Sequence, residues 1–129
     1  MFKVIVLSPP AYLKMVNETY ADKYGYTLAK AMEKELSGDA QKAAIYTVNM
    51  KLKPYEAIAK VIKSACAGIG TDELLLTCCV IRYQHIMGQV NMAHMELFGK
   101  SIHDRIRHEC GGSYKDLLLA LVNKVFPEE

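Results

Sequence analysis

The chain has 129 residues, of which 51% are hydrophobic and 23% are charged, and its formal net charge is +2. This composition is typical of a soluble domain with one core, and so small a charge argues against a nucleic-acid partner. No apolar run reaches the roughly 18 residues of a membrane-spanning helix, so we expect none.

Residues 2–8 form a short apolar run that ends at Pro9 and Pro10. The run lacks the small-residue cleavage site of a signal peptide, so we expect a cytoplasmic protein whose four cysteines are reduced thiols. Taken alone, residues 2–8 are compatible with a β-strand or with the end of a buried helix.

The rest of the chain has apolar side chains at the three-to-four-residue spacing of α-helices, so the expected fold class is all-α. Gly25 is predicted to end the first helix, and Thr27 and Asp39 are predicted to cap the next two. Residues 51–53 are the predicted linker to a helix that begins at Pro54. The predicted helices are residues 11–24, 28–36, 39–49, 54–66, 72–82, 84–98, 101–110 and 113–125.

Three of these helices carry further signals. Residues 72–82 are almost wholly apolar, so this helix is expected to be central in the fold. Ser101 and Ser113 are each followed three residues later by an aspartate, and both pairs resemble the capping boxes that begin helices.

An internal repeat appears at an offset of 74 residues. The offset aligns residues 2–8 with the end of helix 72–82, which favours a helix there. It also predicts a complete second unit of five helices and a first unit that lacks its opening helix and loop. The matched positions include Val16 with Val90, Asn17 with Asn91, Tyr24 with Phe98, Gly25 with Gly99, Glu35 with Glu109 and Gly38 with Gly112.

The segment from Gly68 to Glu73 has two glycines around Ile69 and then a Thr-Asp-Glu run that opens a helix. Glycine tolerates positive φ, so such a loop can turn several carbonyl oxygens to one side. Calcium takes six to eight oxygen ligands, usually with at least one carboxylate. Glu109 ends another predicted helix, at a spacing that suits a return to this loop. The alternative is that the glycines form only a tight turn.

Several motifs of the sequence, which occur in the same order and at the same spacing, resemble those of an annexin repeat. The resemblance implies a complete repeat at residues 51–129, with five helices in a right-handed superhelix. It also implies a partial repeat at residues 1–50, without the first helix and calcium loop. Annexins normally carry four repeats, so this chain resembles a fragment or a reduced member. The motifs are Gly68-Ile69-Gly70-Thr71-Asp72-Glu73, Arg82, Phe98-Gly99-Lys100-Ser101-Ile102, Glu109 to Tyr114, Leu118-Leu119-Ala120-Leu121, and, for the partial repeat, residues 23–39.

The resemblance implies calcium-dependent binding to acidic phospholipid membranes, with the cytoplasmic protein peripherally attached when calcium rises. Carried over by position, the calcium ligands are expected to be the backbone carbonyls of Cys66, Gly68 and Gly70. The Glu109 carboxylate is expected to bind the ion through both of its oxygens.

The same loop offers weaker candidates. The Thr71 carbonyl and the Glu73 carboxylate are candidate ligands of a second site, although acids also suit a helix N-terminus without any metal. Ile69 is a candidate membrane contact, with packing on its own loop as the alternative. The lysines before the loop are expected to form a solvated helix face, with attraction to acidic lipid as the alternative. They are Lys51, Lys53, Lys60 and Lys63.

The sequence contains no Ser/His/Asp order, nucleophile elbow, phosphate loop or Cys-x-x-Cys pair, so we expect neither an enzyme nor a zinc site. The alternative function is a calcium-independent helical module that binds a cytoskeletal partner or its own copies. The missing repeats are expected to leave an apolar surface uncovered, which predicts a homo-oligomer.

Overall fold

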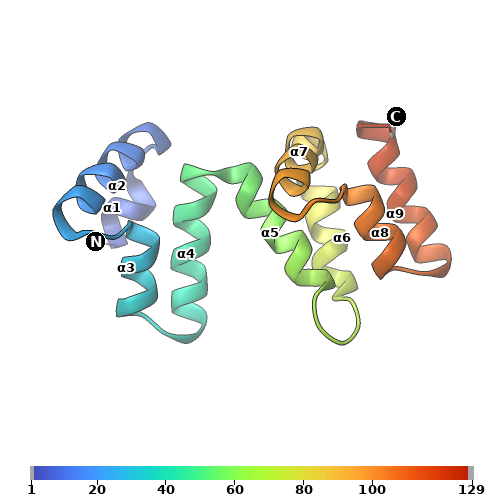
Figure 1. Ribbon diagram of the computed structural model, residues 1–129, viewed down its shortest axis with the longest axis horizontal. Coiled ribbons are helices and arrows are strands. Elements are labelled where there is room, and N and C mark those ends of the chain that lie inside the picture. Colours follow the sequence, from blue (N-terminus) through green and yellow to red (C-terminus); the bar gives the residue numbers. More distant parts are fainter. Residues whose placement is uncertain (1, 128–129) are drawn as a thin grey trace. The chain divides into compact units, whose positions relative to one another are not determined.

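A computed structural model describes residues 2–127, and every secondary-structure element within them is helical (Figure 1), which confirms the all-α class. These residues divide into two compact units, unit 1 up to Ala57 and unit 2 from Ile58. Unit 1 contains α1 (Phe2–Leu7), α2 (Pro10–Tyr24), α3 (Leu28–Glu35) and α4 (Gly38–Leu52). Unit 2 contains most of α5 (Pro54–Cys66), then α6 (Glu73–Arg82), the 3-10 helix η1 (Gln84–Ile86), α7 (Met87–Phe98), α8 (Ile102–Glu109) and α9 (Gly112–Val125).

None of the helices within residues 2–127 combines the length and the hydropathy needed to cross a bilayer.

The helix ends confirm some predicted caps and overturn others. Gly25 ends α2 in the left-handed region at φ 80°, and the Thr27 and Ser101 hydroxyls accept backbone N–H groups at the starts of α3 and α8. The predicted caps Asp39 and Ser113 are wrong, because α4 begins at Gly38 and α9 at Gly112, one residue earlier in each case. Asp39 therefore lies in the first turn, where its charge meets the positive end of the helix dipole.

Lys51 has a role that the sequence analysis missed. The predicted linker at residues 51–53 is wrong, because α4 continues to Leu52 and only Lys53 separates it from α5. The Lys51 ammonium donates to the carbonyls of Ile5, Val6 and Ser8 at 2.7, 2.6 and 2.9 Å. The last carbonyls of a helix have no intrahelical partner, so this lysine caps α1 instead of facing solvent or lipid.

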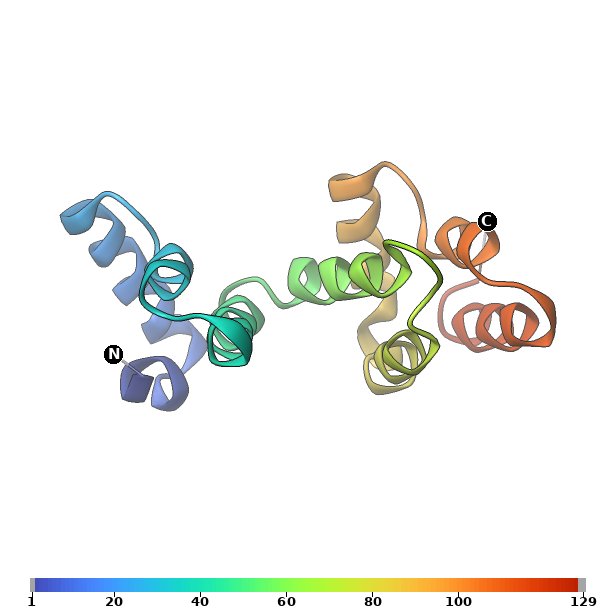
Figure 2. The same cartoon turned by 90° about the horizontal axis from the view of Figure 1, so that it is seen from below.

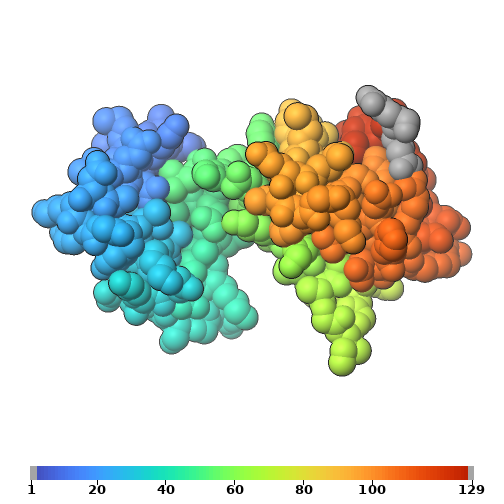
Figure 3. All heavy atoms as spheres, viewed as in Figure 1, coloured from blue at the N-terminus to red at the C-terminus, as the bar shows by residue number. Residues whose placement is uncertain are grey.

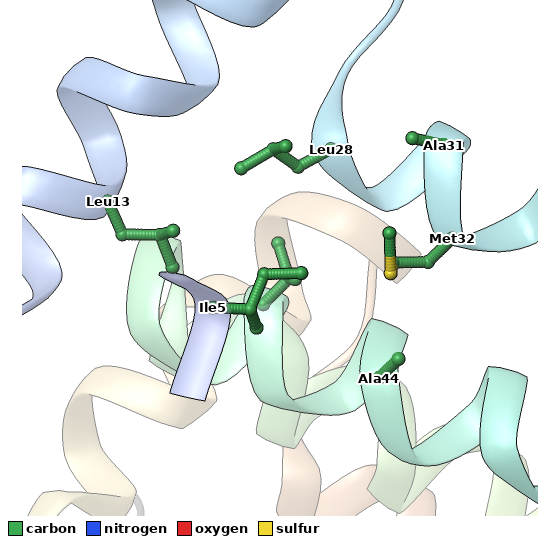
Figure 4. Packing of buried hydrophobic residues seen from close by; sticks show 7 residues of the cluster. Ile5, Leu13, Leu28, Ala31, Met32 and Ala44 are labelled. Atoms are coloured by element: carbon green, nitrogen blue, oxygen red, sulfur yellow. The ribbon is translucent and has the colours of Figure 1, made fainter. Parts of the chain in front are cut away.

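The core of unit 1 is formed by all four of its helices. Figure 4 shows the side chains of Ile5, Leu13, Leu28 and Met32 converging from α1, α2 and α3 onto α4. Full burial of each such large side chain stabilises the unit by about 1.5–3 kcal/mol. The helical placement of Ile5 confirms the helix that the repeat predicted for residues 2–8. The complete cluster is Ile5, Leu13, Leu28, Ala31, Met32, Ala44 and Val48.

In unit 2, α6 is less buried than its composition predicts. Only Leu76, Cys79 and Val80 are buried on this helix, whereas Leu74 and Ile81 are 76% and 51% exposed. The prediction of a central α6 is wrong, because one face packs into unit 2 and the opposite face is left uncovered by the described residues. Hydropathy alone predicts burial without saying which face finds a neighbour.

The 74-residue repeat has a direct structural counterpart in two asparagines. The Asn17 side chain accepts the N–H of Leu28 at 2.9 Å, and the Asn91 side chain accepts the N–H of Ile102 at 2.8 Å. Each asparagine lies on the helix before a chain reversal and satisfies the first N–H of the next helix. The repeat therefore preserves a hydrogen bond that fixes where one helix meets the next.

We expect Asn91→Ala to lower the free energy of unfolding by about 1–3 kcal/mol, because it leaves the partly buried Ile102 N–H without its acceptor. Urea unfolding followed by circular dichroism measures this loss. Gln89→Ala, an exposed position on α7, is the control and is expected to change stability by less than about 0.5 kcal/mol. Equal effects of the two substitutions would contradict the role of Asn91.

Candidate calcium site

The glycine loop between α5 and α6 has the backbone that the sequence analysis expected. Gly68 and Gly70 have φ of 86° and 83°, a region that favours glycine. Ile69 between them is fully exposed at the apex. Figure 3 shows the residues around position 70 projecting from the rest of unit 2. The loop is thus an exposed bend held in shape by its two glycines.

Two hydrogen bonds close the base of this loop. The backbone N–H of Asp72 donates to the carbonyl of Ala65 at 2.7 Å, which joins the end of α5 to the start of α6. The Asp72 carboxylate accepts the N–H of Leu75 at 3.0 Å and caps α6. Asp72 is therefore engaged in building the loop rather than in reaching its apex.

The carbonyls expected to bind calcium are free of backbone partners. Among the loop and cap hydrogen bonds between backbone groups of residues 2–127, none is accepted by the carbonyl of Cys66, Gly68 or Gly70. A backbone carbonyl without a protein partner needs water or a ligand. None of these three oxygens is engaged in those loop and cap bonds.

A hydrogen bond from a loop side chain joins the loop to Glu109, which lies 38 residues after Thr71 in the sequence. The Thr71 hydroxyl donates to the backbone carbonyl of Glu109 at 2.8 Å. Glu109 is the last residue of α8, and the α5–α6 loop and the α8–α9 turn lie at the same end of unit 2 (Figures 1 and 2). The Glu109 side chain is exposed. The sequence pattern predicted only a carbonyl role for Thr71 and gave no sign of this hydroxyl contact.

The pKa values of two thiols report the charge around the loop. The pKa of Cys66 is raised to about 11, mainly by burial. The charges of Cys110 and the Glu109 carboxylate raise this pKa further, whereas the charge of Arg105 lowers it. Burial also raises the pKa of Cys110, followed by the charges of Glu73 and Glu109. Both carboxylates thus lie close enough to act on the thiols beside the loop.

A second tie holds the start of α6. The Tyr114 hydroxyl donates to the carbonyl of Glu73 at 2.8 Å and lies 2.7 Å from the Thr77 hydroxyl. This joins α9 to the first two turns of α6 and leaves the Glu73 side chain exposed. Tyr114 was identified from the sequence only as part of a motif, because the sequence does not show which helix its hydroxyl contacts.

The side chains at this end of unit 2 do not by themselves form a cluster of metal ligands. Within the described residues no group of three or more His, Cys, Asp or Glu side chains is placed to hold a metal ion. A cation at the loop would therefore need backbone carbonyls beside at most two such side chains, and a set of carbonyl and carboxylate oxygens suits a hard cation such as calcium.

The burial of the cysteines predicts an order of reaction with an alkylating reagent. We expect iodoacetamide at neutral pH to modify the exposed Cys78 at least about tenfold faster than Cys66 and Cys79, which are buried and whose pKa values are both raised to about 11. Mass spectrometry of timed digests measures the order, with Cys78→Ser as the control. Modification of Cys66 as fast as Cys78 would contradict this burial.

Comparison with known proteins places the chain in a family. A family model described as Annexin matches residues 57–121, just over half of the chain. Annexin A13 of Schistosoma japonicum is 30% identical over 123 residues, which cover 95% of this chain and 35% of that protein. Annexin A7 of Dictyostelium discoideum is 32% identical over 98 residues, which cover 76% of this chain and 21% of that protein. The chain thus spans about a third or less of these relatives.

Solved structures agree with the sequence comparisons. The crystal structure of calcium-bound annexin (Sm)1 matches with a TM-score of 0.83 at 27% identity, over 95% of this chain and 36% of that one. Annexin III matches with a TM-score of 0.87 at 22% identity, over 93% of this chain and 38% of that one, which shows the shared fold. The helical repeats, the loop and both kinds of comparison lead to one conclusion: the chain belongs to the annexin family.

Proposed function

We propose that this chain binds calcium at the α5–α6 loop and, through the bound ion, the surface of acidic phospholipid membranes. The observation that carries the proposal is the 2.8 Å hydrogen bond from Thr71 to the carbonyl of Glu109, which holds Glu109 beside a loop whose Cys66, Gly68 and Gly70 carbonyls accept no loop or cap bond from the backbone. The proposed ligands are the carbonyls of Cys66, Gly68 and Gly70 and both carboxylate oxygens of Glu109.

The charge balance of such a site explains why lipid and calcium would bind together. One carboxylate cannot neutralise a divalent ion, so calcium affinity without lipid is expected to be weak, with a Kd of roughly 10⁻⁴ to 10⁻³ M. An anionic headgroup supplies the missing negative charge and an additional oxygen ligand. Because each ligand then favours the other, calcium raises lipid affinity and lipid raises calcium affinity by the same factor.

Two lesser contacts belong to the same proposal. The Thr71 carbonyl and the exposed Glu73 carboxylate form a second, weaker calcium site, beside the helix start that Tyr114 holds. Ile69 enters the lipid interface, since its side chain is fully exposed at the apex where apolar groups gain by burial.

The proposal also covers the organisation of the chain. Residues 1–50 form a partial annexin repeat without its first helix and calcium loop, and residues 51–129 form a complete one. The protein acts in the cytoplasm as a peripheral membrane-binding module, without enzymatic activity and without a nucleic-acid partner. Association between copies is part of the proposal, favoured by the exposed Leu74 and Ile81 on α6, and light scattering tests it.

Co-sedimentation with phosphatidylserine vesicles tests the membrane function. We expect the chain to pellet with vesicles when calcium is present, to remain in solution when a chelator replaces it, and to ignore vesicles of neutral phosphatidylcholine. Pelleting that is equal with calcium and with chelator would instead support the calcium-independent interaction module.

A further inference from the structure

The guanidinium of Arg105, on α8 of unit 2, is buried without an acidic partner. The side chain is 8% exposed, and its hydrogen bond runs from Nε–H to Nε2 of His94 at 3.2 Å. The ion pairs within residues 2–127 join other side chains, so no described carboxylate neutralises this charge. Buried charges are normally paired, because a charge that leaves water alone costs free energy. Arg105 is therefore a cation to which the described residues supply no anion.

The outer edge of this guanidinium is open to solvent. Arginine has five N–H donors, and the four on the two Nη atoms of Arg105 have no protein partner within the described residues. No side-chain nitrogen or oxygen of those residues is both sealed from solvent and without a partner, so the Nη atoms must be reachable from outside. Two adjacent NH₂ groups of this kind match the oxygens of a carboxylate or a phosphate.

The orientation of Arg105 is fixed from α7. Nδ1 of His94 lies 2.7 Å from the Lys100 carbonyl, which accepts only from a protonated nitrogen, so Nε2 is bare and accepts from Arg105. The His94 ring is completely buried and packs edge-on against Phe98, with 5.0 Å between the ring centres. The inner edge of the guanidinium is thus held, and its outer edge loses little freedom when a ligand binds.

A second cation lies at the same aromatic ring. The guanidinium carbon of Arg105 is 5.8 Å from the centre of the Phe98 ring, and the Lys63 ammonium of α5 is 5.3 Å from it. Lys63 is exposed, and its flexible stem lets the ammonium follow a ligand. Two positive groups at one ring favour a ligand with more than one negative charge, and a phosphate monoester carries about −1.5 to −2 at pH 7.

The packing of the repeat does not require these charges. At the 74-residue offset, the counterparts of Arg105 and His94 are Ala31 and Tyr20. Ala31 is 1% exposed, so unit 1 buries the same helix position with a methyl group. Because one repeat packs without an arginine there, the fold alone does not explain Arg105, and this favours a role in binding.

We propose that Arg105 and Lys63 form a binding site for a phosphate group. The two Nη atoms of Arg105 donate to two phosphate oxygens, and the Lys63 ammonium supplies a second positive charge. The site contains none of the proposed calcium ligands, so it goes beyond the calcium-dependent function and works without calcium. The chemistry is the same whether a soluble compound or a lipid headgroup carries the phosphate, and the experiment distinguishes these sources.

Inorganic phosphate is the probe, titrated at pH 7.5 and constant ionic strength into the isotope-labelled chain in calcium-free buffer. We expect the NMR signals of the Arg105 Nε–H and the His94 ring nitrogens to shift saturably, with a Kd of roughly 10⁻³ M or below. Acetate has a single charge and is expected to bind at least about tenfold more weakly. Acetate binding as tight as phosphate binding would contradict a phosphate site.

Two pairs of variants locate the binding. Arg105→Gln is expected to weaken phosphate binding at least about tenfold, because it removes the charged donors. Arg107→Gln, on the same helix but paired with Asp104 at 3.0 Å, is expected to leave it unchanged. Since Arg105 is buried, Lys63→Gln provides a test at an exposed position, with an expected loss of about twofold to fivefold. Lys60→Gln, also exposed on α5, is its control.

The absence of a saturable shift, or phosphate binding that neither Arg105→Gln nor Lys63→Gln weakens, overturns the proposal. Phosphatidic acid vesicles in calcium-free buffer identify the source of the phosphate group. Pelleting that Arg105→Gln abolishes assigns it to a lipid headgroup, and saturable phosphate binding without pelleting assigns it to a soluble compound. Both results support the site, and neither depends on the outcome of the calcium experiments.

Discussion

A Glu109→Gln variant is expected to lose calcium-dependent sedimentation with phosphatidylserine vesicles. The substitution keeps the size of the side chain but removes the charge and one of the two carboxylate oxygens proposed to bind the ion. With three neutral carbonyls left, we expect calcium affinity to fall by roughly a hundredfold or more. Isothermal titration with calcium in the presence of vesicles measures the affinity directly, and the pelleting assay measures its consequence.

The internal repeat offers a matched control for this experiment. Glu35 ends α3 just as Glu109 ends α8, but the described residues of unit 1 contain no counterpart of the Gly68–Gly70 loop for it to face. Glu35→Gln makes the same chemical change at the corresponding position and is expected to leave calcium-dependent pelleting intact. Thr71→Val, which removes the hydroxyl that holds the Glu109 carbonyl, is expected to give an intermediate loss. A Glu109→Gln variant that pellets normally with calcium would remove the proposed site.

The stability of unit 2 is expected to fall as the pH is lowered below about 6.5. His94 is completely buried, and this burial is the main cause of its lowered pKa. The hydrogen bond to the Lys100 carbonyl raises the pKa, whereas the charges of Arg105 and Lys100 lower it. Its Nδ1 lies 2.7 Å from that carbonyl and its Nε2 accepts the Arg105 Nε–H at 3.2 Å. A carbonyl accepts only from a protonated nitrogen, so Nδ1 carries the proton and Nε2 is bare. Protonation of Nε2 would set two positive groups against each other.

The direction follows from proton linkage. In the unfolded chain His94 has its ordinary pKa of about 6.5 and binds a proton at a higher pH than it does in the fold. The His94 contribution is fully present above that value and is lost progressively as the pH falls from it toward the lower pKa of the folded state, at a slope of up to about 1.4 kcal/mol per pH unit for one proton. Urea unfolding from pH 7.5 to 4.5, followed by circular dichroism, measures the slope.

His94→Asn provides the comparison. The asparagine amide can still donate toward the Lys100 carbonyl but does not titrate, so this variant is expected to be less stable at pH 7.5 by about 2–4 kcal/mol, with a shallower acid dependence. Every other titrating group is shared, so the difference between the two curves isolates His94. Parallel curves would show that His94 does not cause the acid loss.

Several features of the fold were predicted correctly from the sequence. Apolar spacing predicted the all-α class, and Gly25 and Thr27 marked helix ends correctly because positive φ and the capping hydroxyl are local properties of one or two residues. The repeat identified α1 as a helix when its own composition left a strand open. The glycine loop could be located in the sequence because positive φ at Gly68 and Gly70 is likewise a local property of these residues.

Contacts between distant segments could not be deduced in this way. Lys51 was expected to be a solvated lysine, and its ammonium instead caps α1, since the carbonyls that it meets lie more than 40 residues away. The exposed face of α6 is likewise decided by which of the described helices pack against it. Asp39 and Ser113 failed as caps because each helix begins one residue earlier than the pattern indicates.

The sequence by itself determined that the chain is helical, that it contains a repeat, and that a glycine bend and a distant glutamate are the residues to examine. Only the tertiary structure decided that the Thr71 hydroxyl holds Glu109 and that His94 and Arg105 share a buried hydrogen bond. The physical reason is range: backbone preference and hydrophobic period act within a few residues of the chain. A hydrogen bond across 38 residues, or a face without a neighbour, exists only once the helices have packed.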